Sequence, residues 1–150
     1  MLEPILAFVH IAALLAVVVF LTSQAALCRP EWMNPAVVRR LAKVDLIYLV
    51  AAVALLLTGL ARIIWGDKGM DWYLHNWLLH VKITAYIVIA LMSLGPTFAY
   101  RRWLKALQRD GSLPLPTDVT RIRKLVMIEA HLIALVPLAA VFMARGYGSF

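Results

Sequence analysis

The sequence predicts an all-α protein, a bundle of four antiparallel helices that cross a membrane. Four apolar stretches fill most of the 150 residues, and each is long enough to span a bilayer as a helix. Hydrophobic residues make up 63% of the chain, well above the roughly one half that a soluble domain carries. The predicted spans are Pro4–Cys28, Val44–Trp65, Trp77–Tyr100 and Ile122–Ala144. We therefore expect residues 1–150 to form a single transmembrane domain in contact with the lipid bilayer.

Basic residues predict the direction of each span. The first connection, residues 29–43, carries four of the 15 Lys and Arg residues, and residues 101–124 carry seven. Connections rich in Lys and Arg face the cytoplasm, so both chain ends are predicted to lie outside, on the periplasmic side of a bacterial inner membrane. Because the charges gather between spans rather than along one exposed face, we expect no nucleic acid as a partner.

Turn residues predict where helices begin. Asn34, followed by Pro35, is expected to start a short run into the second span, and Thr117 with Asp118 is expected to cap the fourth. The outer connection is rich in aromatic residues of the kind found at the lipid headgroup boundary, namely Trp65, Trp72, Tyr73 and Trp77. We interpret them as an interfacial belt.

Ionisable side chains inside the spans are the strongest indication of function. Charged and titratable groups are disfavoured in lipid and usually face protein or a water-filled cavity. Within the predicted spans, those that lipid would disfavour most are His10, Asp45, His80, Lys82, Glu129 and His131. Any functional site is expected where these residues meet.

Helical periodicity predicts which faces are inward. Glu3, His10 and Gln24 recur at multiples of seven residues, so they share one stripe of the first span. Spacings of three and four residues likewise place Asp45 and Arg62 on one seam of the second span. The same spacing places Lys82, Tyr86, Ile89, Ser93 and Thr97 on one seam of the third.

Two pairs cannot both face inward. Glu129 and His131 are two residues apart, so they project about 200° from one another on a helix, and His80 and Lys82 do the same. One member of each pair is expected to face lipid, the interface or a partner subunit, either a second copy or another membrane protein.

Depth separates the ionisable residues into two groups. His10, His80 and Lys82 are expected roughly 5–9 Å below the outer boundary, with Arg62 at the rim, at a rise of 1.5 Å per residue. Asp45 and Glu129 are expected in the cytoplasmic third, and His131 lies beside Glu129 in the sequence.

The outer group has the chemistry of a tetrapyrrole site. Neutral histidine nitrogens ligate haem iron, and Lys or Arg neutralises propionates. His10 and His80 are thus the candidate iron ligands, Lys82 and Arg62 the candidate propionate partners, and haem b the candidate cofactor. Two alternatives remain open: a proton or ion relay, and a structural or assembly role as an accessory subunit of a membrane complex.

Most of the chain resembles an uncharacterised family of bacterial four-helix inner-membrane proteins, the DUF2214 type. The resemblance rests on Ala-Phe-Val-His10, Val-Asp45-Leu-Ile-Tyr, the run Gly66–Asn76, Lys82, Pro96, and the segment from Glu129 through Pro137 to Ala-Arg-Gly146. It implies the architecture and the location but no reaction.

A second, local resemblance is to the HemJ-type protoporphyrinogen oxidases. It rests on His10 in a first span and on Trp77-Leu-Leu-His-Val-Lys82 at the start of a later one. It implies that His10 is the axial ligand and Lys82 the carboxylate or acid–base partner. The sequence departs from that pattern by an extra leucine in the segment and by the absence of the HemJ-type C-terminal portion.

Overall fold

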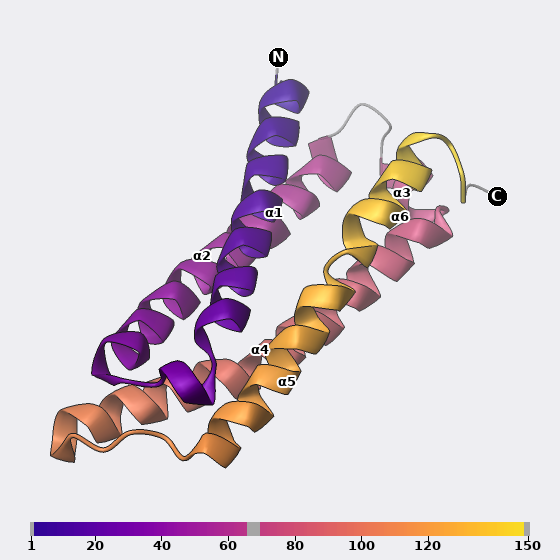
Figure 1. Cartoon of the computed structure of the whole chain (residues 1–150). Coiled ribbons are helices and arrows are strands. Elements are labelled where there is room, and N and C mark those ends of the chain that lie inside the picture. Colours follow the sequence, from indigo (N-terminus) through magenta and orange to yellow (C-terminus); the bar gives the residue numbers. More distant parts are fainter. Residues whose placement is uncertain (1, 66–69, 149–150) are drawn as a thin grey trace.

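The computed structural model describes residues 2–65 and 70–148, and all of its regular structure in these ranges is helical. Four segments are long and apolar enough to cross a membrane: Glu3–Leu27, Pro35–Trp65, Trp77–Asp110 and Pro116–Ala144. They run antiparallel, so that the first helix begins and the last helix ends at the same end of the bundle (Figure 1). The predicted fold class is confirmed.

Helices α1 (Leu2–Leu27) and α2 (Pro35–Trp65) form the first hairpin, with a short 3-10 helix, η1 (Pro30–Trp32), between them. Asn34 caps α2 as predicted, because its side-chain oxygen accepts a hydrogen bond of 3.0 Å from the backbone N–H of Val37. Helix α2 begins nine residues before the predicted membrane entry at Val44, so its first two turns extend the hairpin on that side.

Helix α4 (Trp77–Asp110) is the longest, and it also extends past its predicted membrane end at Tyr100. Asn76 starts it by accepting a hydrogen bond of 3.0 Å from the N–H of Leu78. Gly111 ends it in the left-handed conformation, with φ of 73°, which a residue without Cβ adopts at little cost. Before α4 lies the short α3 (Met70–Leu74), where only a connection was expected.

The fourth span differs from the prediction in two ways. It is divided into α5 (Pro116–Leu132) and α6 (Leu135–Ala144), and Figure 1 shows the turn between them. Pro137 accounts for the break, because proline has no N–H and its ring clashes with the carbonyl of the residue four positions earlier, Ile133. The predicted cap was wrong as well: α5 begins at Pro116 with no side-chain cap, so Thr117 and Asp118 lie inside the first turn.

The outer aromatic residues divide between surface and interior. Trp65 and Trp77 are exposed, as expected at an interface, whereas Tyr73 is buried against Leu78, Leu79 and Met143 in a small cluster of its own. The run noted in the sequence includes residues 66–69, which lie outside the described residues.

The main core lies toward the end of the bundle that holds η1 and the α4–α5 connection. Its buried members include Leu21, Cys28, Leu41, Tyr100 and Val119 from four helices and the turn after α1. At this end the α1–α2 hairpin packs on α4 and α5, and toward the chain ends the hairpin diverges from α4 and α6 (Figure 1).

Most of each span's surface faces outward. Only 17–22% of the most apolar 18-residue window of each span is buried within the protein. The exposed side chains in these windows are large and apolar, such as Phe8, Leu57, Leu91 and Leu138. Such a surface suits hydrocarbon rather than water, so the outward faces of the helices are suited to contact with lipid.

Candidate functional site

His10 packs into the α1–α2 hairpin one third of the way along α1. Its Nδ1 atom lies 2.9 Å from the Thr58 hydroxyl, and the neighbouring Gly59 leaves room for the ring, since a Cβ at that position would stand 3.2 Å from His10 Cε1. The stripe predicted on α1 is confirmed to face protein, because Gln24 is buried and so is Val17, which lies on the same stripe seven residues after His10.

The hydrogen bonds of Thr58 determine which nitrogen of His10 carries the proton. The Thr58 hydroxyl lies 2.7 Å from the carbonyl oxygen of Ala54, a separation between two oxygens that requires a proton between them. A hydroxyl has one proton to donate, so toward His10 it can only accept. Nδ1 of His10 therefore carries the hydrogen, and in a neutral ring Nε2 keeps its lone pair, which is the form that ligates a metal.

Two cations share this outer half of the bundle with His10. Arg62 on α2 and Lys82 on α4 both interact electrostatically with the His10 ring. Arg62 has a partner, because its guanidinium forms an ion pair of 2.9 Å with Glu3 of α1. For Lys82, by contrast, residues 2–65 and 70–148 provide neither an ion pair nor a hydrogen bond.

Lys82 is directed toward α2 by its helix face. Tyr86, one turn further along α4, lies on the same seam, and its hydroxyl donates a hydrogen bond of 2.6 Å to the carbonyl oxygen of Ala52 in α2. Lys82 itself is half-buried. The predicted seam from Lys82 to Thr97 is thus confirmed as the side of α4 that meets the hairpin.

His80 does not join this group. Its side chain is exposed, and its Nε2 lies 3.1 Å from the carbonyl oxygen of Leu74 in the preceding α3. The sequence argument that His80 and Lys82 project apart is consistent with this arrangement. The structure therefore brings together His10, Arg62 and Lys82, which we call the outer cluster.

A second group of polar residues is buried deeper, in the main core. Asp45 of α2 is 3% exposed and Glu129 of α5 is 1% exposed. The Asp45 carboxylate accepts hydrogen bonds from Thr97 of α4 at 3.0 Å and from Gln24 of α1 at 3.4 Å. Four helices thus meet at these residues, and we call Gln24, Asp45, Thr97 and Glu129 the inner cluster.

His131 lies outside the inner cluster. It is exposed on the far side of α5, and its Nδ1 lies 2.6 Å from the carbonyl oxygen of Met127 in its own helix. The prediction that only one of Glu129 and His131 faces inward is confirmed, and the inward residue is Glu129.

The inner cluster is where sequence reasoning fell short. It placed Asp45 and Glu129 at a similar depth but did not assign Gln24 and Thr97 as the donors that join them to α1 and α4. The signal was present, because Gln24 continues the His10 stripe at heptad spacing and Thr97 ends the Lys82 seam. What was missing was the relative rotation of the helices, which only the packed structure supplies.

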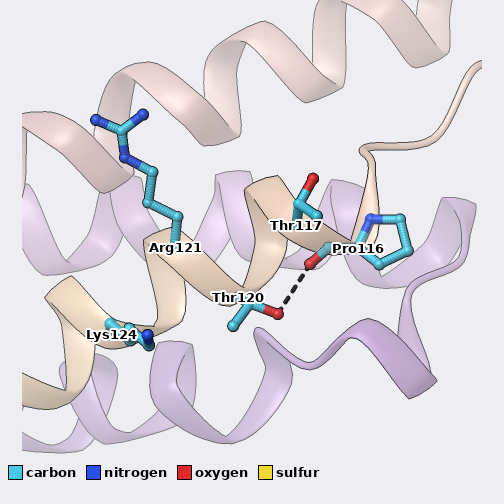
Figure 2. A pocket seen from close by; sticks show the side chains of 5 residues that line it. All are labelled: Pro116, Thr117, Thr120, Arg121 and Lys124. Carbon is cyan, nitrogen blue, oxygen red and sulfur yellow. Dashed lines mark hydrogen bonds between the residues drawn. The ribbon is translucent and has the colours of Figure 1, made fainter.

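Other features of the described residues are less suited to a ligand. No group of three or more His, Cys, Asp or Glu side chains gathers in residues 2–65 and 70–148. A shallow depression at the start of α5 is lined by Thr117, Thr120, Arg121 and Lys124 around Pro116. Figure 2 shows that Thr120 donates its hydroxyl proton to the Pro116 carbonyl and that the two basic side chains project to different sides, so they do not converge on one point.

Comparison with known proteins identifies the family but no activity. The family model described as a predicted membrane protein, DUF2214, matches residues 2–148. No curated protein and no solved structure matches the chain significantly. With nearly all of its length matched, and with four helices suited to a bilayer, the chain belongs to the DUF2214 family of predicted membrane proteins.

Proposed function

We propose that this membrane protein binds a tetrapyrrole, with haem b as the working example, at the outer cluster. His10 is the iron ligand through Nε2, and Lys82 together with Arg62 neutralises the propionates. The site lies between α1, α2 and α4, in the half of the bundle where the hairpin diverges from the other helices (Figure 1).

One observation carries this proposal: Lys82 lies in a helix suited to cross a membrane, has no anionic partner in the described part of the chain, and acts electrostatically on His10, whose Nε2 keeps a lone pair. An unpaired cation in this region is costly. A ligand with carboxylates and a metal centre would satisfy both groups together, whereas a purely structural site would need neither.

The residues present fit such a group in part. The hydrogen bond to Thr58 fixes the orientation and the tautomer of His10, as second partners do for histidine ligands of metals. Arg62 already forms an ion pair with Glu3, so Lys82 is the cation that is better placed to bind a carboxylate of the ligand. His80 is exposed, and its Nε2 atom lies beside the carbonyl oxygen of Leu74, so we assign it a place at the rim of the proposed site rather than as an iron ligand.

A haem bound here would supply one-electron transfer. The protein's own part would be to hold it, exclude lipid and set the charge around it. We further propose, from the bias of basic residues toward the first and third connections, that the protein lies in the bacterial inner membrane with both chain ends outside. The outer cluster would then open toward the periplasm.

The absorbance spectrum of the detergent-purified protein tests the proposal. We expect a Soret band that stays with the protein through affinity and size-exclusion steps. A folded, monodisperse protein that is colourless, and that gains no such band when haem b is added, would contradict it. That result would favour the other class of function, a non-catalytic accessory subunit whose partner is another membrane protein or a second copy of this chain.

A further inference from the structure

Two carboxyl groups lie close together in the core without a cation to balance them. Asp45 and Glu129 are each at least 97% buried, they interact electrostatically, and neither forms an ion pair with any described residue. Arg101 acts electrostatically on Asp45, and its side chain is exposed on the part of α4 that leads to the α4–α5 connection. Two negative charges are expensive to hold in such an environment.

The side chains around the pair are polar but mostly uncharged. Gln24 faces it from α1, and Thr97 and Tyr100 face it from α4. Tyr48, on α2 itself, interacts with both carboxyl groups and lies beside Ser93 of α4. Arg101 acts on Asp45 electrostatically, but no lysine, arginine or histidine of the described residues forms a hydrogen bond or an ion pair with either carboxyl group.

The two carboxyl groups have different surroundings. Asp45 accepts two hydrogen bonds on one oxygen, and such bonds stabilise the ionised form. The Oε1 atom of Glu129 is fully buried and has no hydrogen-bond partner among the described residues. An ionised Glu129 would leave a charged oxygen unsolvated, whereas a carboxylic acid there leaves only a neutral one.

The backbone beside Glu129 is irregular. Its carbonyl oxygen accepts the last regular bond of α5, from the N–H of Ile133 at 2.9 Å, and the chain then turns before α6. Pro96 interrupts the hydrogen bonding of α4 one residue before Thr97. The turn after α5 and the proline in α4 therefore both lie beside the carboxyl pair. Irregular backbone within a membrane is tolerated where it is buried in protein or lines water.

From this juxtaposition we propose that Asp45 and Glu129 form a proton-binding site within the membrane, which carries one negative charge at neutral pH. Asp45 holds the charge and Glu129 holds the proton. Proton uptake forms one O–H bond on the Glu129 carboxylate and breaks one O–H bond of a hydronium ion, which becomes water. The inference is independent of the tetrapyrrole site, which lies in the other half of the bundle.

Infrared spectroscopy of the full-length protein in lipid vesicles tests this proposal. We expect the C=O stretch of a protonated carboxylic acid at neutral pH, shifted in D2O, and lost in Glu129→Gln. The matched control is Asp118→Asn, which removes an exposed carboxylate and should leave the band unchanged. A wild-type protein without the band at neutral pH, or a band that persists in Glu129→Gln, would overturn the proposal.

Chemical labelling tests the same point without a mutation. Dicyclohexylcarbodiimide reacts with protonated carboxyl groups in apolar surroundings. After treatment of the wild-type protein at neutral pH, mass spectrometry should find most of the label on Glu129, and raising the pH should reduce it. Labelling confined to Asp45 or to exposed carboxylates would contradict the assignment of the proton to Glu129.

Discussion

The imidazole of His10 rests against the backbone of α2 at Gly59, where a Cβ would stand 3.2 Å from His10 Cε1. That separation is tight for carbon atoms in contact, so the ring occupies the space that the missing side chain leaves. Together with the bond to Thr58, the contact holds His10 in one orientation.

Gly59→Ala should therefore displace His10. We expect any bound tetrapyrrole to show a shifted or weakened Soret band, although alanine favours the helix by about 1 kcal/mol relative to glycine. The matched control is Gly95→Ala in α4, where the added methyl meets only the end of the Leu125 side chain at 3.1 Å. Equal spectra for the two variants would show that the Gly59 contact does not position His10.

Thr58→Val should lower the stability of the protein, because it removes the hydrogen bond that holds the His10 ring. The change keeps the shape of the side chain but removes the Thr58 oxygen as an acceptor for His10, which leaves the backbone of Leu55, and the loss of one such hydrogen bond costs about 0.5–1.5 kcal/mol. We expect a loss of that size in the free energy of unfolding in detergent.

Thr22→Val is the control for that measurement. The Thr22 hydroxyl is bonded only to carbonyls of its own helix at an exposed position, so its loss should change the free energy of unfolding by no more than about 0.5 kcal/mol. A Thr58→Val protein as stable as the Thr22→Val protein would mean that His10 does not depend on Thr58.

Lys82→Ala should lose bound ligand, and Lys82→Arg should keep part of it. The reason is that the proposed site needs a cation opposite carboxylates, and arginine supplies one with a different geometry. The measurement is the ratio of haem to protein after purification. If both variants retain the wild-type ratio, Lys82 serves only to reach the headgroups.

Reporter fusions can determine which end of the bundle faces the cytoplasm. A reporter active only in the cytoplasm should give signal when inserted after Ser112, in the connection between α4 and α5, and none at the C-terminus. The expectation follows from the basic residues of the first and third connections. The opposite pattern would place the outer cluster on the cytoplasmic side.

Sequence periodicity was sufficient to predict the helices and which of their faces are buried. The heptad stripe of α1 predicted that Gln24 would be buried, and the seam of α4 predicted the same for Ser93 and Thr97, because a helix repeats its face every seven residues. The lipid-facing and protein-facing sides could be separated because polar residues are disfavoured in hydrocarbon.

The contacts between helices were not predictable in the same way. Whether Gln24 or another donor reaches Asp45 depends on how each helix is rotated, and single-helix patterns carry no such information. The division of the fourth span also depended on one residue, Pro137, within an otherwise uniform apolar run. His80 was assigned to the outer group from its depth alone. In the structure its Nε2 atom lies within hydrogen-bond distance of the carbonyl oxygen of Leu74 in α3, a helix that the sequence did not predict.

The most direct test of the central claim compares the Soret band of His10→Ala with that of His131→Ala, each purified in detergent and shown to be folded by circular dichroism. His10 lies in the outer cluster, and His131 is exposed on the far side of α5. We predict that the band is abolished or shifted in His10→Ala and unchanged in His131→Ala. A band that depends on His131 and survives the loss of His10 would contradict the placement of the site.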